Sequence, residues 1–532
     1  EFVQAFAPKG RDRNPTHRYR FPPQEFSIDE GDEVIEVKGE KIGTVQAVSL
    51  ETYTIDIKKS GKAMDIHPQA VHVSERVDPT VLATSLMNIA LAIDEEGFDR
   101  QWSYHASKDL LMKRAPQLAG GKNIRDFMQT NDPGSAAVEI ALNLDRSVLP
   151  VQGPPGAGKT YTGARMIIAL LKAGKKVGVT AISHSVIRTL FQKIKELADE
   201  TNMRVDFVHK VTDKTDFADW IEEVTDSAKA LGALGAGKLV GGTAWLWADA
   251  NARGILDYLF IDEAGQVSLA QVLAASGASR NLVLLGDPQQ LEQPRRGAHP
   301  EDSDVSALTY LLDGHPTMPD EKGIFLGTTR RMHPRITAFT STVFYEGRLA
   351  GLSGLERQVI NGGTSFDGAG LFYVPCVHAG NQNRSPEETD AIVRIVTHLL
   401  AQGTWTNRLG KTRPLTNSDI LIVAPFNAQV AALIERLPEI RIGTVDKFQG
   451  KEAPVVIYTM VSSTAEDAPR GMSFLFSPNR LNVATSRALS ACILVASPRL
   501  LEPECKTIEQ MKWANALCTF KEMAKEVRLQ RI

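Results

Sequence analysis

Short apolar runs alternate with amphipathic stretches from residue 148 onward. Four of these runs are continuous and rich in Val, Leu and Ile, at residues 148–151, 177–180, 256–261 and 282–285. Continuous runs of this length are typical of strands that are buried on both faces of a parallel sheet. Residues 186–197 lie between two of the runs and carry apolar side chains at helical spacing. The alternation predicts an α/β fold in which helices cover a parallel sheet.

The same pattern returns after about residue 320, with apolar runs at residues 420–423, 455–458 and 493–495. A polar stretch rich in Gly and Pro, at residues 299–323, separates the two sets and predicts a hinge. The chain is therefore expected to form two α/β domains in tandem, with a cleft between them.

The first 130 residues follow other patterns. Residues 26–73 alternate between apolar and polar positions and are interrupted by glycines, which predicts short antiparallel strands in a small β-barrel. Residues 79–128 have helical spacing, and residues 1–21 read as a basic, solvated arm, with nucleic-acid contact as the alternative. The predicted domains are a basic N-terminal arm at 1–25, a β-barrel at 26–77, a helical stalk at 78–130, and α/β domains at 131–320 and 321–532.

Composition excludes several classes of protein. The chain has 532 residues, of which 43% are hydrophobic and 23% charged, and this argues against a disordered or fibrous protein. The formal net charge is -3, so a polyanion would have to be held by a local surface. Four cysteines without a CxxC pair give no zinc or disulfide pattern. No apolar run is long enough to span a bilayer, and we expect a cytoplasmic protein without a membrane partner.

A glycine-rich loop directly follows the first apolar run and precedes a helix. It matches the pattern GxxxxGK[ST] with Gly153, Pro154, Pro155, Gly156, Ala157, Gly158, Lys159 and Thr160. Glycines let the backbone curl so that its N–H groups bind phosphates. Lys159 is then expected to reach the β- and γ-phosphates of a nucleotide, and the Thr160 hydroxyl to bind Mg²⁺.

An acidic pair, Asp262 and Glu263, ends the apolar run at 256–261. A carboxylate at the carboxyl end of a strand beside a phosphate loop can hold Mg²⁺. The neighbouring carboxylate can orient and deprotonate an attacking water. Acidic pairs are common in loops, but together with the phosphate loop this pair indicates nucleotide hydrolysis.

The order of these motifs resembles that of superfamily 1 helicases. The phosphate loop, Asp-Glu-Ala-Gly at 262–265 and Gly-Asp-Pro-Gln-Gln-Leu at 286–291 resemble their motifs I, II and III. Residues 330–334 and 344–347 resemble the RMHP and FYxG block of the up-frameshift (nonsense-mediated decay) helicases, and residues 443–452 and 480–488 resemble their motifs V and VI. The match covers about residues 135–500 and implies two tandem RecA-like P-loop domains.

The resemblance implies ATP as the nucleotide and roles for residues outside the phosphate loop. Gln290 would sense the γ-phosphate, and Arg331 and Arg487 would reach across from the second domain to neutralise transition-state charge. The expected catalytic residues are Lys159, Asp262, Glu263, Gln290, Arg331 and Arg487. The expected ligands of Mg²⁺ are Thr160 and Asp262. Further ATP contacts are expected from Tyr161, Arg330, Gly450 and Glu452, the last of these on the ribose.

Two positions depart from the family pattern. The family usually has Tyr where this chain has Arg330, although a guanidinium plane can also stack on adenine. The Gln that would read the adenine edge is absent from its usual spacing ahead of the phosphate loop, at residues 131–136. Selectivity for adenine is therefore in question, whereas phosphate chemistry is not.

The resemblance also implies a groove that holds single-stranded nucleic acid. Hydroxyl and backbone N–H groups suit sequence-independent contacts with phosphates, and an aromatic ring can stack on a base. The implied contact residues are Ser183, His184, Thr243, Pro425, Phe426 and Thr444. A purely structural role is the alternative for His184, and Trp245 and Trp247 are expected in the core.

One further pattern, Asp56-Ile57-Lys58, matches the (D/E)xK core of many nucleases. It lies on an alternating strand without companion carboxylates, so we expect a solvated strand face and no nuclease activity in this chain. The two ends of the chain resemble bacterial proteins that join a RecB-like nuclease to a helicase. That resemblance implies a nuclease segment ahead of Glu1.

The sequence thus predicts an ATP-dependent helicase or translocase of the superfamily 1B type that uses ATP and Mg²⁺. It is expected to be a monomer that moves 5′→3′ along a single strand, with DNA favoured and RNA as the alternative. Two rival functions are a translocase that remodels protein–nucleic acid complexes without unwinding and an ATP-gated clamp on single strands. The second α/β domain disfavours a P-loop kinase or GTPase.

Overall fold

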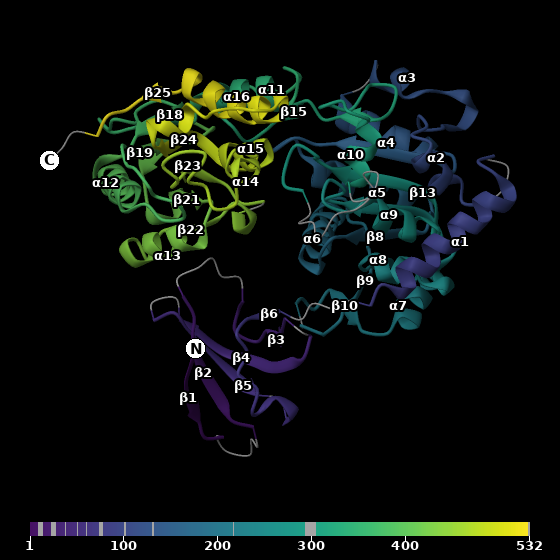
Figure 1. Ribbon diagram of the computed structural model, residues 1–532. Coiled ribbons are helices and arrows are strands. Elements are labelled where there is room, and N and C mark those ends of the chain that lie inside the picture. The colour runs from purple at the N-terminus through teal and green to yellow at the C-terminus, as the bar shows by residue number, and fades with distance from the viewer. Residues whose placement is uncertain are drawn as a thin grey trace.

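The computed structural model describes residues 1–8, 14–22, 28–37, 39–49, 52–59, 61–73, 78–99, 103–129, 132–215, 217–292, 305–448 and 450–529. Two α/β domains lie side by side, and a smaller sheet made by the N-terminal residues lies below them in Figure 1. Parts of the predicted basic arm, of the predicted hinge and of the stretch at 131–136 fall outside the described residues.

The first α/β domain is built on an eight-stranded sheet with the order β10-β9-β11-β8-β12-β13-β7-β14. Its strands are β7 (Val148–Gln152), β8 (Val177–Ala181), β9 (Phe207–Lys210), β10 (Ile221–Val224), β11 (Leu239–Gly241), β12 (Leu256–Asp262), β13 (Ser279–Gly286) and β14 (Ile324–Phe325). Every neighbouring pair is parallel, so the predicted parallel sheet is confirmed.

Helices cover both faces of this sheet, as the continuous apolar runs predict. In β13, Leu282 and Leu284 join one buried cluster, and Val283 and Leu285 join another on the opposite side. One face packs against α3 (Ile124–Met128), α4 (Pro133–Asn143), α5 (Lys159–Lys172) and α6 (His184–Glu200). The other face packs against α1 (Thr80–Glu96), α2 (His105–Leu111), α7 (Ser227–Ala233), α8 (Ala244–Trp247), α9 (Leu269–Ser276) and α10 (Ala307–Leu312).

The second α/β domain has a six-stranded sheet with the order β22-β21-β23-β24-β18-β25, and its pairs are also parallel. Its strands are β18 (Gly370–Pro375), β21 (Ile420–Ala424), β22 (Arg441–Thr444), β23 (Ala453–Thr459), β24 (Ala488–Ala496) and β25 (Lys525–Glu526). Its helices are α11 (Pro334–Phe344), α12 (Pro386–Gln402), α13 (Asn427–Arg436), α14 (Met472–Leu475), α15 (Pro478–Ser486) and α16 (Ile508–Met523). Helices α12 and α13 cover one face, and α11, α15 and α16 cover the other. Two small sheets accompany it, formed by β15 (Thr328–Thr329) with β16 (Ala350–Gly351), and by β17 (Val359–Asn361), β19 (Thr404–Thr406) and β20 (Thr412–Pro414).

The boundary between the two domains lies later than predicted. β14 pairs with β7, so the first sheet continues beyond residue 320, and the predicted hinge at 299–323 contains α10. The apolar residues Ile324, Phe325 and Leu326 are buried beside β7, which extends the first domain. The chain crosses to the second domain at residues 326–331, because β15 already pairs with β16 of that domain.

The N-terminal residues form an antiparallel sheet with the order β1-β2-β5-β4-β3-β6. Its strands are β1 (Phe2–Phe6), β2 (Thr16–Arg20), β3 (Glu33–Glu36), β4 (Lys41–Ser49), β5 (Thr54–Lys59) and β6 (Val71–Val73). The prediction of a solvated arm at 1–25 is therefore wrong for β1 and β2. The alternate side chains His17 and Tyr19 of β2 are buried, and β2 pairs with β5. Within the described part of the chain the two edge strands, β1 and β6, do not pair with each other, so a closed barrel is not confirmed.

The Asp56-Ile57-Lys58 pattern lies on β5. Asp56 accepts two hydrogen bonds of 2.7 Å from the Arg18 guanidinium on the neighbouring strand. This carboxylate is thus held in a cross-strand ion pair, in agreement with the expected strand face. Among the helices that the structure describes, we find none that is both long and apolar enough to cross a membrane.

Candidate ATP and nucleic-acid sites

The phosphate loop lies at the carboxyl edge of the first sheet, between β7 and α5. Gln152, the last residue of β7, is in register with Gly286 at the end of β13, and Asp262 ends the next strand, β12. Gly156 and Gly158 have φ angles of 74° and 82°, which side chains of L-residues rarely adopt. The sheet therefore brings motifs I, II and III to one edge, as ligand sites of open α/β sheets require.

Lys159 and Glu263 form an ion pair in this structure. The Lys159 Nζ lies 2.7 Å from Glu263 Oε2, and both side chains are largely buried. Burial alone would lower the pKa of the lysine, but the charges of Glu263 and Asp262 outweigh it and raise that pKa. The ammonium expected to bind phosphates is thus kept protonated by the two carboxylates of the acidic pair.

The two carboxylates of the acidic pair have different surroundings. Asp262 is 2% exposed, and burial raises its pKa to about 6 against the opposing charge of Lys159. Glu263 is more accessible and has a φ angle of 52°, a left-handed conformation that is uncommon for a residue other than glycine. The backbone N–H of Glu263 donates to Asp262 Oδ1 at 2.9 Å, which fixes the turn. Strain of this kind often occurs at functional sites.

Arg487 and Gln290 join the two α/β domains. Arg487 Nη2 donates to Gln290 Oε1 at 3.0 Å, and Gln290 Nε2 donates to Asp287 Oδ2 at 2.7 Å. Arg487 is 2% exposed, and its Nε donates to the carbonyl of Val483 on α15. Burial and the neighbouring charge of Arg331 lower the pKa of this guanidinium. One of the two predicted arginine fingers is therefore already in contact with the predicted γ-phosphate sensor.

The other predicted finger, Arg331, lies against the phosphate loop. A Cβ atom on Gly156 would lie 2.6 Å from Arg331 Cβ, so only glycine fits there. The Arg331 guanidinium donates from Nε to Glu452 Oε2 at 2.6 Å. Glu452 was expected on the ribose, and in this structure its carboxylate holds Arg331 instead; a ribose contact stays a prediction.

The remaining predicted ATP contacts lie around the same loop. The backbone N–H of Arg330 donates to the Gly156 carbonyl at 2.9 Å, and its guanidinium lies 3.0 Å from where a Cβ on Gly158 would be. Tyr161 is 42% exposed on the first turn of α5, with the Arg165 guanidinium 5.9 Å from its ring centre. Gly450 has a φ angle of 79° just ahead of Glu452. Stacking of Arg330 on adenine stays a prediction.

A buried polar contact between the domains was not predicted as part of the site. The Tyr345 hydroxyl donates to Asp287 Oδ2 at 2.6 Å and accepts from Asn482 Nδ2 at 2.9 Å. Asn482 also donates to the Gln289 carbonyl at 2.7 Å. Burial raises the pKa of Asp287, and burial followed by the Asp287 charge raises that of Tyr345. One signal was present in the sequence: Asn482 is a polar residue in the apolar stretch Leu481 to Ala484.

On the first domain, the predicted nucleic-acid contacts follow adjacent strands. Ser183 comes after β8 and caps α6 by accepting from the Val186 N–H at 3.4 Å; Thr243 comes after β11, which pairs with β8. His184 Nδ1 lies 3.0 Å from His209 Nε2. Burial lowers the pKa of both histidines, that of His209 to about 4. The alternative of a structural role for His184 is therefore supported by a buried partner.

On the second domain, the structure contradicts the predicted exposure of two contacts, Pro425 and Phe426. Thr444 ends β22 in register with Ala424 at the end of β21, so Pro425 and Phe426 follow at the same edge. Phe426 is only 1% exposed, however, because its ring packs against Phe474 with 5.6 Å between centroids. A base cannot stack on Phe426 in this arrangement, and Pro425 is buried as well.

The two parallel sheets, the phosphate loop and the arginines from the second domain define a two-domain P-loop ATPase. Two family models, each described as an AAA domain, match residues 129–309 and 304–499. The chain is 25% identical over 476 residues to a regulator of nonsense transcripts 1 homolog from Drosophila melanogaster, covering 78% of this chain and 38% of that protein.

Two other relatives carry helicase names. Identity is 24% over 402 residues to the DNA replication ATP-dependent helicase/nuclease dna2 of Schizosaccharomyces pombe, with 68% of this chain and 28% of that protein covered. The chain is also 29% identical over 265 residues to the probable helicase MAGATAMA 3 of Arabidopsis thaliana, and the alignment covers 47% of this chain and 31% of that protein. The two family models and these relatives support a superfamily 1 helicase that is similar to the up-frameshift helicases. The chain spans less than two fifths of the length of these three relatives.

Proposed function

We propose that this chain is an ATP-driven motor that moves along single-stranded nucleic acid and separates duplex strands. The contact between Arg487 and Gln290 carries this proposal. It connects the second α/β domain to the nucleotide edge of the first, so that the state of the nucleotide can change the relation of the two domains. Such coupling between ATP and the domain arrangement is what a translocating motor needs.

Hydrolysis at this site follows from the chain's own groups. Lys159 binds the β- and γ-phosphates after leaving Glu263, and Glu263 then accepts the proton of the attacking water. Arg331 and Arg487 neutralise the charge that develops on the transferred phosphoryl group, while Gln290 positions Arg487.

A Mg²⁺ ion fits the oxygen groups beside the phosphate loop. Thr160 offers a hydroxyl at the start of α5, and Asp262 offers a carboxylate whose pKa is raised mainly by burial. Oxygen ligands together with nucleotide phosphates are the coordination that Mg²⁺ prefers. When bound, the ion draws charge from the β- and γ-phosphates.

We infer that the strand runs across the carboxyl edges of both sheets. Ser183 and Thr243 on the first domain and Thr444 on the second offer hydroxyl groups of the kind that bind backbone phosphates. The family resemblance supports movement in the 5′→3′ direction by a monomer. DNA is favoured because one relative is named for DNA replication.

One pair of measurements tests the proposal. ATPase activity is measured with and without oligothymidylate and oligouridylate, alongside unwinding of duplexes with 5′ or 3′ tails. The proposal expects stimulation by single strands and unwinding of the 5′-tailed duplex. Stimulation without unwinding would favour the remodelling translocase, and binding without turnover would favour the ATP-gated clamp. No stimulation and no binding of any strand would overturn the assignment to nucleic acid.

A further inference from the structure

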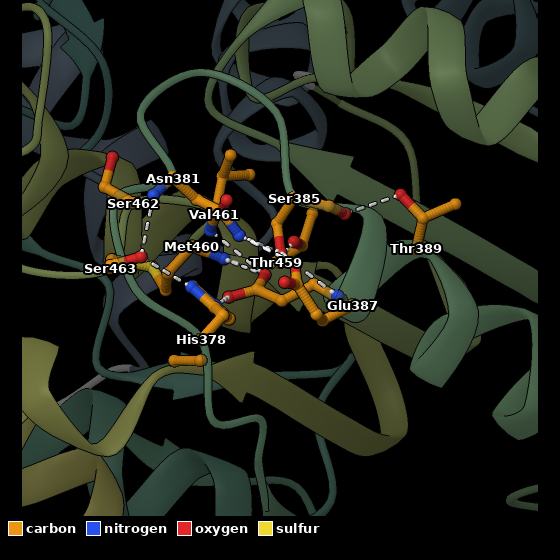
Figure 2. A network of polar contacts seen from close by, with 12 residues as sticks. His378, Asn381, Ser385, Glu387, Thr389, Thr459, Met460, Val461, Ser462 and Ser463 are labelled. Carbon is orange, nitrogen blue, oxygen red and sulfur yellow. Dashed lines mark hydrogen bonds and ion pairs between the residues drawn. The ribbon is translucent and has the colours of Figure 1, made fainter.

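A buried polar network lies in the second domain, where the connection after β23 begins (Figure 2). Glu388 Oε2 accepts the backbone N–H groups of Met460 at 3.1 Å and Val461 at 3.0 Å. Glu388 Oε1 lies 3.0 Å from His378 Nε2, and His378 Nδ1 lies 2.7 Å from Ser463 Oγ. The side chains of His378 and Glu388 are fully buried, so a ligand cannot reach them. The network therefore anchors the connection and forms no binding site.

The outer face of α1 presents the opposite situation, because apolar side chains are exposed there. The helix contains no charged residue from Thr80 to Ile93. Met87 is 60% exposed and Leu91 is 51% exposed. These two residues are about one helical turn apart, so their side chains are neighbours on one face. A surface helix normally carries charged or polar residues on its solvent side. The outer face of α1 thus leaves apolar area uncovered.

The inner face of α1 is already used by the first domain. Leu82 and Ile89 are buried, and Leu82 belongs to the core cluster on this side of the sheet. The Ser85 hydroxyl donates to the Ala274 carbonyl of α9 at 2.7 Å. Figure 1 shows α1 on the outer flank of the first domain, on the side away from the second domain. The exposed face is therefore held in a fixed orientation and takes no part in the contact between the domains.

Two exposed carboxylates lie about one turn beyond Leu91 on the same face. They belong to Asp94 and Glu95, which follow Leu91 at the spacing of neighbouring side chains on a helix. Neither forms an ion pair within the part of the chain that the structure describes, whereas the adjacent Glu96 pairs with Lys108 at 3.0 Å. The last turn of α1 has no basic residue, and the carboxyl end of a helix dipole is itself negative. This end of the face therefore carries uncompensated negative charge.

We propose that the outer face of α1 is a docking surface for a basic amphipathic helix of a partner protein. Apolar side chains of that helix cover Met87 and Leu91, and its Lys or Arg residues lie against Asp94 and Glu95. The inference does not depend on the proposed function, since it uses no residue of the nucleotide or strand sites.

Other occupants fit this face less well. An antiparallel second copy of α1 places the two carboxylates beside an uncharged first turn, and a parallel copy brings like charges together. An anionic membrane surface is repelled by the same carboxylates. A basic helix alone satisfies both the apolar stripe and the negative charge at its end.

The test is binding of a fluorescein-labelled peptide of 17 residues, the length of α1, with Leu at helical spacing and Lys on both flanks. A second peptide keeps every Leu and replaces each Lys with Glu. The Lys peptide should bind the chain, and the Glu peptide should bind at least about tenfold more weakly. Leu91→Ser should weaken binding of the Lys peptide about tenfold, because a buried apolar contact is lost. The double variant Asp94→Asn, Glu95→Gln should weaken it about threefold and reduce its salt dependence.

Leu409→Ser is the matched control, because Leu409 is an exposed leucine of the second domain. It should bind the Lys peptide like the wild type, and both serine variants should melt at the wild-type temperature, since the altered side chains are exposed. Equal binding by wild type and Leu91→Ser, or no binding by the wild type, would overturn the proposal. Sedimentation of the chain alone tests a second copy as the occupant. A dimer that Leu91→Ser dissociates would also overturn the proposal of a basic helix.

Discussion

The Tyr345 hydroxyl of the second domain donates to the Asp287 carboxylate of the first at 2.6 Å, in a fully buried position. Asp287 also accepts from Gln290, which accepts from Arg487. The Tyr345 hydroxyl therefore helps to hold Asp287, and through Asp287 it helps to hold Gln290, which contacts the predicted arginine finger Arg487. A hydroxyl in a buried network of this kind affects geometry as well as stability.

Tyr345→Phe is expected to lower kcat of the strand-stimulated ATPase about tenfold. Without the phenol hydroxyl, Asp287 is held less firmly, and Gln290, which donates to Asp287, then positions Arg487 less well. The KM for ATP should change little, since Lys159 and the phosphate loop are untouched. Steady-state phosphate release checks both values.

Tyr258→Phe is the matched control for this change. Its hydroxyl is also buried and donates to the carbonyl of Ala141 at 2.8 Å, but it has no link to the nucleotide edge. Each variant should lose about 1–3 kcal/mol of stability, and only Tyr345→Phe should lose turnover. A normal kcat in Tyr345→Phe would contradict the positioning role.

Glu263→Gln should bind ATP at least as tightly as the wild type and hydrolyse it 10²–10⁴-fold more slowly, by rough analogy with other general bases. The amide cannot accept the proton of water, and it no longer competes with the phosphates for Lys159, which now lies 2.7 Å from the carboxylate. A fluorescent ATP analogue measures binding, and single-turnover phosphate release measures hydrolysis. The exposed Glu321→Gln serves as the control, and turnover retained in Glu263→Gln would reject Glu263 as the base.

Arg487→Lys should reduce kcat by about 10³-fold even though the charge is kept. The guanidinium donates to Val483 through Nε and to Gln290 through Nη2, and a lysine cannot make both bonds at once. The exposed Arg499→Lys provides a control with the same chemistry. If Arg487→Lys turned over ATP at the wild-type rate, the arginine-finger assignment would be wrong.

Acid should destabilise the first domain through His209. Burial first, and then the charges of His184 and Arg188, lower the pKa of this imidazole to about 4, below the 6.5 of an unfolded histidine. Between these values the unfolded state binds the proton and the folded state does not, so stability is complete above pH 6.5 and falls as the pH drops towards 4. The loss by pH 4 should be on the order of 3 kcal/mol.

Melting temperatures of the wild type and His209→Gln across this pH range measure the effect. The Gln variant should show a shallower fall, because it cannot be protonated, whereas His72→Gln on the exposed strand β6 should follow the wild type. Parallel curves for wild type and His209→Gln would contradict the prediction.

The sequence was a good guide wherever neighbouring residues decide the structure. The glycines around Lys159 and the run ending at Asp262 identify the nucleotide edge, because strand, loop and helix follow one another in the chain. Phe426 could not be placed in this way, since its burial depends on Phe474. Tyr345, Asp287 and Asn482 come from three distant stretches and meet only because the two domains pack together. The strands β1 and β2 were missed because five-residue alternation in a basic stretch is a weak signal.

The segment that enters the second domain runs directly over the phosphate loop. Thr329 Oγ1 donates to the Pro155 carbonyl at 2.8 Å, and the next residue, Arg330, donates its N–H to the Gly156 carbonyl. The first residues of the second domain are therefore hydrogen-bonded directly to the phosphate loop. In the proposed motor, a change in the shape of the loop would therefore act directly on the segment that leads into the second domain, without a long relay of side chains.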